Sequence, residues 1–282
     1  MPHGSAAPPR RRTERLSSRH MDARPTEAVI LAAGAGERLR CRDEAPPKPL
    51  TSVLGKTLLE HSIRTFVGAG VQHCTVVVGF EGATVARAAR GLGERYAVQV
   101  TTVHNADWER GNGTSVLAAS AVVANPFFLA MGDHLFEPAI LGALQAQDGG
   151  APLTLAVDHA WDALDHADLD EATKVRLNGS TIVDIGKEIR TFDAVDTGIF
   201  LCRPAVFGAL EAAQAGGDAS LSGAVRVLAA RAEAEVGDIT GRFWQDVDTP
   251  ADLARAERRL GALLAEQGSK RAVDGVSLGR RA

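Results

Sequence analysis

Two glycines and two cationic side chains near the start of the chain have the types and spacing of a phosphate-binding site. Gly34 and Gly36 follow an apolar run, where bare backbone N–H groups can approach a ligand and bind phosphate oxygens. Arg38 comes next, and Lys48 lies in Pro-Pro-Lys-Pro, whose prolines restrict the backbone on both sides of the lysine. Because the charge of a triphosphate must be balanced before a nucleophile approaches, these residues favour a triphosphate site.

The glycine turn taken alone is a weak signal. It lacks the third glycine of a dinucleotide-binding fingerprint and the Gly-Lys-Ser/Thr ending of a P-loop, so a tight turn between a strand and a helix explains it equally well. The two cations favour the phosphate interpretation, because a solvated surface lysine needs no prolines around it.

Three aspartates farther along the chain have the chemistry of a magnesium site. Asp133 ends an apolar segment, and Asp246 and Asp248 lie in Asp-Val-Asp-Thr-Pro. Mg²⁺ prefers one or two carboxylates together with phosphate oxygens and water. Asp133 with Asp248 or Asp246 would supply that set. The structural alternatives are a surface turn at Asp133 and a helix cap at the second motif, although Thr249 could provide that cap.

The run Gly-Asn-Gly-Thr-Ser, residues 111–115, has the composition of a site for a nucleobase. The glycines would let a flat ring lie against the backbone, and Asn112 offers both a donor and an acceptor to a pyrimidine edge. Thr114 or Ser115 could instead simply cap the helix that follows.

Alternating strands and helices must position these residues. The pattern predicts buried strands at Ala28–Gly34, His73–Phe80, Tyr96–Asn105 and Asn125–His134, and helices at Thr57–Gly70, 82–93 and Thr114–Ala124. Strands that are apolar on both faces and alternate with helices indicate a mostly parallel sheet covered on both sides. Later short segments, in 151–159, 173–177, 180–186 and 196–202, predict antiparallel strands added to this sheet. A closing helix is expected at Pro250–Gly268.

Composition limits the classes of function. The 282 residues are 45% hydrophobic and read as one continuous α/β domain at 26–265, between a disordered N-terminal tail at 1–25 and a flexible C-terminal tail at 266–282. A net charge of −4 excludes a global field for nucleic acid. Three scattered cysteines indicate a reducing compartment, and no apolar run is long enough to span a bilayer. We therefore expect a cytoplasmic protein.

The motif Leu-Ala-Ala-Gly-x-Gly-x-Arg, followed by Pro-Lys-Pro-Leu, resembles the signature of the sugar nucleotidyltransferase superfamily, which includes the MobA-like NTP transferases. The resemblance implies a Rossmann-like (GT-A type) α/β fold, with a mostly parallel mixed central sheet and helices on both faces. It implies catalytic roles for Arg38 and Lys48, and magnesium bound by Asp133 and by a second aspartate, with Asp248 preferred to Asp246. The nucleotide-binding residues it implies are Leu31, Ala32, Ala33, Gly34, Gly36, Asn112, Gly113 and Ser115.

A narrower resemblance rests on the motifs ERGNGTS, MGDHLFEP, EATKVRL, GKEI and FDAVDTGIFLC, which occur in that order. Together they resemble the CTP:inositol-1-phosphate cytidylyltransferases, which join CTP and inositol 1-phosphate into CDP-inositol and pyrophosphate. The resemblance covers roughly Glu27 to Leu260. It implies a catalytic, substrate-binding Lys174 and further substrate contacts from Asp133, Lys187, Asp196 and Thr197, while Gly198 would leave room for the acceptor ring. His134 receives no catalytic role.

The resemblance also bears on partners. Bifunctional members of this family continue into a membrane-embedded CDP-alcohol phosphotransferase. Because this sequence has no apolar run that could form such a membrane domain, we expect a separate membrane enzyme to use the product. The expected partners are CTP and a small phosphorylated polyol, without nucleic acid or membrane insertion, and a homodimer stays open.

Two rival interpretations remain. One is another nucleotidyltransferase, acting on a sugar 1-phosphate or on phosphocholine. Choline recognition uses an aromatic cage, which one tyrosine and three tryptophans disfavour. The other is a nucleotide-binding domain without catalysis.

Overall fold

The computed structural model describes residues 25–39, 45–163 and 166–278. The predicted tail at 1–25 therefore lies almost entirely outside the described residues. Within them, one central sheet of nine strands has the order β5-β4-β1-β6-β11-β8-β12-β10-β9. In that order the strands are Gln99–His104, His73–Val78, Glu27–Ala32, Phe127–Met131, Ala194–Cys202, Leu153–Asp158, Ala234–Asp238, Thr181–Gly186 and Lys174–Asn178.

The sheet is mixed, as expected. β5, β4, β1 and β6 are parallel to one another, whereas β11 is antiparallel to β6, β8 and β9. β12 is parallel to β8, and β10 is antiparallel to β12 and β9. β12 is not among the strands predicted from the sequence. Its sequence, Ala-Glu-Val-Gly-Asp, is too short and too polar to stand out as a buried strand.

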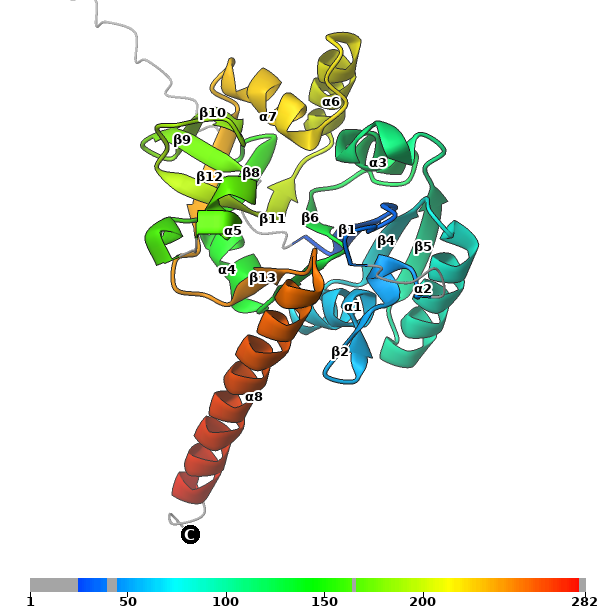
Figure 1. Ribbon diagram of the computed structural model, residues 1–282, viewed down its shortest axis with the longest axis vertical. Coiled ribbons are helices and arrows are strands. Elements are labelled where there is room, and N and C mark those ends of the chain that lie inside the picture. Colours follow the sequence, from blue (N-terminus) through cyan, green and yellow to red (C-terminus); the bar gives the residue numbers. More distant parts are fainter. Residues whose placement is uncertain (1–24, 40–44, 164–165, 279–282) are drawn as a thin grey trace, which may run out of the picture.

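Helices cover both faces of the sheet (Figure 1). One face carries α1 (Leu58–Gly68), α2 (Gly82–Tyr96) and α4 (Ala139–Ala146), whose buried residues share one hydrophobic core with Ala28, Ile30 and Ala32 of β1. The other carries α3 (Asn112–Ala118), α6 (Ala205–Ala215) and α7 (Leu221–Ala229), whose buried residues share a second core with Val29 and Leu31. Alternate residues of β1 thus enter two different cores, which explains why the whole strand is apolar.

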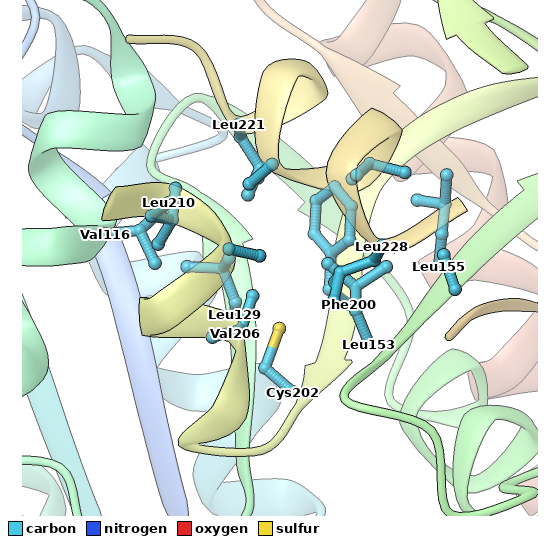
Figure 2. Close-up of a cluster of buried hydrophobic side chains, with 14 of the residues drawn as sticks. Val116, Leu129, Leu153, Leu155, Phe200, Cys202, Val206, Leu210, Leu221 and Leu228 are labelled. Carbon is cyan, nitrogen blue, oxygen red and sulfur yellow. The ribbon is translucent and has the colours of Figure 1, made fainter. Parts of the chain in front are cut away.

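Figure 2 shows the second of these cores. Val206 and Leu210 of α6 and Leu221 and Leu228 of α7 meet the strand residues Leu129 and Phe200 there. Cys202 is fully buried in the same cluster, and burial raises the pKa of its thiol. It is a core residue, as its apolar strand predicted.

Several element boundaries differ from the predicted ones. Tyr96 ends α2 instead of starting a strand, because Ala97 turns the chain in a left-handed conformation before β5. The expected helix Thr114–Ala124 begins at Asn112 and passes into a 3₁₀ turn, Ala119–Ala121. The expected strand Asn125–His134 ends at Met131, and His134 starts a separate short strand.

The closing helix α8 (Pro250–Leu278) is longer than predicted. It runs away from the body of the molecule (Figure 1) and includes most of the segment expected to be a flexible tail at 266–282. Gly268 and Gly275 weaken a helix by only about 1 kcal/mol each relative to alanine, and no proline follows Pro250. None of the described helices combines the length and apolar character that a membrane span requires.

The remaining elements are small. β2 (Ser52–Val53) pairs with β3 (Lys56–Thr57), and β7 (His134–Phe136) pairs with β13 (Trp244–Asp246), both antiparallel. The helix α5 (His166–Glu171) and the 3₁₀ turns Lys48–Leu50, Trp108–Arg110 and Trp161–Ala163 complete the described elements.

Candidate active site

A cavity of about 430 Å³ opens at the carboxyl ends of β1 and β6. Parallel strands place the residues that follow them at one edge of the sheet, which is the usual ligand crevice of such folds. The cavity is lined by Leu31, Ala32, Gly34, Ala35, Gly36, Glu37, Arg38, Lys48, Pro49, Trp108, Gly132, Asp133 and Asp248. The glycine turn, both cations and two of the three aspartates predicted from sequence therefore meet in one place. Ala33 is buried beside them, and its carbonyl accepts a hydrogen bond from Phe80.

Gly36 allows Lys48 to reach the cavity. Its φ of +66° lies in the left-handed region, and a Cβ at this position would overlap the aliphatic stem of Lys48. Lys48 lies in the 3₁₀ turn that follows Pro47, and only 8% of the residue is exposed. The glycine thus serves two purposes, because it permits the turn and leaves space for the lysine side chain.

Lys48 links the two carboxylates of the cavity. Its Nζ lies 2.5 Å from Oδ2 of Asp133 and also contacts Oδ1 of Asp248. Arg38 donates to Oδ2 of Asp248 at 2.8 Å. Burial opposes the charge of Lys48, but Asp133 and Asp248 outweigh it and raise the pKa of the lysine. Burial likewise opposes the charge of Asp133, yet Lys48 and His134 hold the pKa of that carboxyl well below its usual range. Lys48 and Asp133 are therefore both charged at neutral pH.

The ribbon of β7 and β13 brings the two carboxylates together. His134 pairs with Asp246 across the ribbon, and the Val247 N–H donates to the carbonyl of Asp133 at 3.1 Å. Asp133 directly precedes β7 and Asp248 closely follows β13, so the pairing register sets their separation. Asp246 does not line the cavity, and burial raises the pKa of its carboxyl. Of the two candidate aspartates, Asp248 is the one beside Asp133.

The start of α8 is capped without Asp248. Thr249 and Asp252 bond reciprocally: the Thr249 N–H donates to Oδ2 of Asp252 at 2.8 Å, and the Asp252 N–H donates to Oγ1 of Thr249 at 3.2 Å. This is a capping box with aspartate in the third helical position. The side-chain carboxylate of Asp248 is therefore directed to the cavity and is not needed as the cap.

The donor set of the cavity fits a magnesium ion that shares its coordination with a ligand. Among the residues that the structure describes, no group of three or more His, Cys, Asp or Glu side chains could hold a metal. Asp133 and Asp248 nevertheless converge on one cationic position, now filled by the Lys48 ammonium. Mg²⁺ is commonly bound by one or two carboxylates plus phosphate oxygens, and these two aspartates supply that number.

The lysines predicted to meet the acceptor lie outside this cavity. Lys174 is 8% exposed, and its Nζ donates to the carbonyls of Lys187 at 2.9 Å and Asp170 at 3.3 Å. The Nζ of Lys187 pairs with Glu171 at 3.3 Å, and Glu171 pairs in turn with Arg38 at 3.3 Å. Contacts of Lys174 and Lys187 with an acceptor phosphate therefore stay predictions.

The structure separates the two acceptor residues predicted on β11. Thr197 is fully buried, and its hydroxyl donates to the carbonyl of Ala156 at 2.8 Å, so the expected contact with acceptor hydroxyls is wrong for its side chain. Asp196 faces the other way and accepts a hydrogen bond from the Gly198 N–H at 2.7 Å. Gly198 leaves room for a ring, but that ring is the imidazole of His134.

Asp196 makes stability depend on pH. Burial raises the pKa of its carboxyl to about 6, above the value near 3.9 expected in the unfolded chain. Below pH 4 the group is protonated in both states; between pH 4 and 6 only the unfolded state loses the proton, so stability falls as pH rises. We expect Asp196→Asn to match the wild type below pH 4 and to exceed its free energy of unfolding by about 3 kcal/mol above pH 6. Urea unfolding across this range measures the difference, and a pH-independent difference contradicts the assignment.

The residues predicted to read the base are mostly engaged within the protein. Oδ1 of Asn112 accepts from the Leu221 N–H at 2.8 Å, and a Cβ on Gly113 would collide with the backbone of Ala219 and Ser220. Ser115 is 3% exposed, and its hydroxyl accepts from Asn105 at 2.9 Å, so its side chain is not available to a base. The glycine here admits the segment before α7, a long-range contact that local spacing could not reveal. A base contact by Asn112 stays a prediction.

Trp108 is a cavity residue that the sequence interpretation missed. It packs edge-on against Phe80, with ring centroids 5.8 Å apart, and a Cβ on Gly79 would overlap it. In the sheet, β5 and β6 lie on opposite sides of β1. Trp108 follows β5 and Asp133 follows β6, so the two residues enter the cavity from opposite sides of β1. The available signal was an aromatic residue between a parallel strand and a glycine-rich helix start.

Comparisons with known proteins show which family and which structures the chain resembles. A family model described as the MobA-like NTP transferase domain matches residues 28–273. The chain is 40% identical over 232 residues to a Rubrobacter xylanophilus protein named bifunctional IPC transferase and DIPP synthase, covering 82% of this chain and 51% of that one. It is also 34% identical over 259 residues to the CMP-5'-(3-aminopropyl)phosphonate synthase of Streptomyces rubellomurinus, covering 84% of this chain and 39% of that one.

A solved structure matches over nearly its whole length. The inositol-1-phosphate CTP transferase from T. maritima superposes with a TM-score of 0.70 at 30% identity, and the match covers 82% of this chain and 92% of that one. The chain spans about half the length of the first curated relatives it matches.

Proposed function

Since the chain belongs to the family of MobA-like NTP transferase domains, we propose that it transfers the cytidylyl group of CTP to inositol 1-phosphate, giving CDP-inositol and pyrophosphate. This family membership confirms the resemblance that the glycine turn and the Pro-Lys-Pro motif predicted. The choice of CTP and inositol 1-phosphate draws support from the names of the T. maritima structure and of the Rubrobacter relative.

The observation that supports the proposal most is the convergence of Arg38, Lys48, Asp133 and Asp248 at the glycine turn. Joining two phosphorylated molecules requires their mutual repulsion to be offset. This cavity offers two cationic side chains, two carboxylates that could bind a metal ion, and the backbone N–H groups of a glycine turn. Together these groups can offset the repulsion between the two phosphorylated molecules. A polar cavity without this charge arrangement would fit many other ligands.

In the proposed reaction, an oxygen of the inositol phosphate attacks the α-phosphorus of CTP in line. The bond from that phosphorus to the bridging oxygen breaks, and pyrophosphate leaves with the bonding electrons. The backbone of the glycine turn binds phosphate oxygens, and Lys48 and Arg38 stabilise the negative charge that develops in the transition state. A phosphate monoester is already largely ionised at neutral pH, with a second pKa near 6, so no side chain has to remove a proton.

Asp133 and Asp248 would hold Mg²⁺, which neutralises triphosphate charge when bound. When phosphates and metal occupy the cavity, Lys48 can exchange its carboxylate partners for phosphate oxygens, because the stem that passes Gly36 already directs its ammonium there.

The proposed function is tested by incubating the protein with each of the four nucleoside triphosphates, Mg²⁺ and one acceptor at a time, and reading the products by mass. The acceptors are inositol 1-phosphate, glucose 1-phosphate, phosphocholine and 3-aminopropylphosphonate. We expect CDP-inositol from CTP and inositol 1-phosphate at the highest rate. Faster reaction with the phosphonate would favour the activity named for the Streptomyces relative. CTP binding without pyrophosphate release from any acceptor would favour a domain without catalysis.

Trp108 lines the cavity, and we expect the cytosine base of CTP to stack on its ring. The fluorescence of this tryptophan then tests where the base binds. Aromatic stacking on a base contributes about 1 to 3 kcal/mol, so we expect Trp108→Leu to raise the Kd for CTP about tenfold or more. We also expect CTP to quench the tryptophan fluorescence of the wild type and of a Trp161→Phe control, because Trp161 does not line the cavity. Equal quenching in a Trp108→Phe variant would show that the base binds elsewhere.

A further inference from the structure

The carboxylate of Asp133 is held at both of its oxygens. Oδ2 faces the cavity and lies 2.5 Å from Nζ of Lys48, while Oδ1 lies 2.6 Å from Nδ1 of His134. An ionised carboxylate only accepts hydrogen bonds, so Nδ1 of His134 is the donor. Without this bond, Lys48 would be the partner left to orient the carboxylate, and it is itself the cation that a metal ion would displace.

Strand β11 fixes the opposite side of the His134 ring. A Cβ on Gly198 would lie 2.5 Å from Nε2 and 2.7 Å from Cδ2 of the imidazole, so the ring rests directly on this glycine. Gly198 has a φ of +71°, and the pairing of β11 with β8 shifts register between Asp196 and Phe200. Bulges of this kind occur next to active sites, where they reorient a strand locally.

The main chain around His134 is also fixed. The β7–β13 pairing places His134 opposite Asp246, and the Val247 N–H bonds to the carbonyl of Asp133. The side chain of His134 is 14% exposed and does not line the cavity. It is therefore placed to act on Asp133 and not on a substrate.

We infer that His134 is a positioning residue, which holds the carboxylate of Asp133 with Oδ2 directed at the metal position. A glycine is required at position 198 because any side chain there would overlap the imidazole of His134. The inference rests on the proposed function, since the metal belongs to that reaction. It assigns to His134 and Gly198 a role in metal affinity. Hydrogen-bond partners of metal ligands typically change metal affinity or activity by 10- to 100-fold when they are replaced.

The test is the binding of Mn²⁺ in the presence of CTP and without any acceptor, followed by electron paramagnetic resonance. We expect His134→Leu to weaken Mn²⁺ binding at least tenfold, whereas the affinity for CTP without metal stays within about twofold. His134→Asn keeps an N–H donor close to the position of Nδ1, so we expect it to recover most of the metal affinity. Gly198→Ala displaces the ring and should reproduce the leucine result.

Circular dichroism and thermal unfolding confirm that each variant is folded; should His134→Leu not fold, Gly198→Ala carries the comparison. Unchanged Mn²⁺ affinity in a folded His134→Leu or Gly198→Ala protein overturns the inference. Equal losses in His134→Asn and His134→Leu also overturn it, because the hydrogen bond would then not be the cause. Since no acceptor is present, these outcomes are separate from the product assay, whose failure would reject the proposed function itself.

Discussion

Replacing Lys48 by methionine will strongly slow product formation and, at the same time, strengthen the binding of Mn²⁺ to the nucleotide-free protein. The ammonium of Lys48 lies against the carboxylates of Asp133 and Asp248, where a divalent ion would bind. A metal ion that binds to these two carboxylates has to displace this internal cation. Methionine keeps much of the aliphatic stem beside Gly36 but removes the charge, so the two carboxylates become available.

The expected magnitudes are large and opposite in sign. Loss of one preorganised charge-stabilising donor lowers turnover about 10²- to 10³-fold, and Lys48 offers a full positive charge. We expect Mn²⁺ to bind the nucleotide-free variant at least tenfold more tightly, which corresponds to about 1.4 kcal/mol. Paramagnetic resonance titration measures the affinity, and Lys56→Met, outside the cavity, is the matched control. Weaker or unchanged metal binding would show that Lys48 does not occupy the metal position.

The second prediction with a large effect separates Asp133 and Asp248, which line the cavity, from Asp246, which does not. We expect Asp133→Asn and Asp248→Asn each to lower kcat/KM by about 10³-fold and to raise the Mg²⁺ concentration needed for half-maximal rate. Each removes a formal charge from the pair that would hold the metal, while the amide keeps the size and one oxygen of the side chain. Asp246→Asn serves as the control, because Asp246 lies on the same ribbon but outside the cavity.

For Asp246→Asn we expect less than a tenfold change in kcat/KM. Steady-state kinetics over a series of Mg²⁺ concentrations gives all three values in one experiment. If Asp246→Asn were as damaging as Asp248→Asn, the ribbon would have to place its carboxylates differently from the structure described above.

The parts of the site that sequence predicted well are those defined by short local patterns. The glycine turn follows an apolar strand directly, and the prolines around Lys48 limit its backbone, so both could be placed without knowledge of the rest of the chain. Asp133 was placed at the cavity because it follows a buried strand of a parallel sheet. These inferences need only the period of the strand and the direction of the chain.

The parts that sequence could not predict depend on contacts between distant segments. Asp246 and Asp248 differ in role because β13 pairs with β7 in one register and because Asp252 completes the cap. Thr197 turns into the core whereas Asp196 does not, since successive residues of a strand face opposite sides. Spacing alone gives the alternation but not which side faces the ligand.

Glycines were the most ambiguous residues. Gly113 and Gly198 were expected to make room for a base and for an acceptor ring. In the structure, Gly113 admits the backbone of Ala219 and Ser220, and Gly198 admits the imidazole of His134. A glycine in a motif indicates that something approaches closely, but the sequence does not say whether that neighbour is a ligand or another part of the chain.

The central claim is that one cavity binds both the nucleotide triphosphate and its metal ion at the glycine turn of β1. The most direct measurement is a crystal structure with CTP and Mn²⁺, in which anomalous scattering locates the metal. We predict a single strong peak bound by Asp133 and Asp248, with triphosphate oxygens on the glycine turn and Lys48 moved from the carboxylates to the phosphates. A nucleotide bound away from this turn, or a metal peak remote from Asp133, would contradict the account.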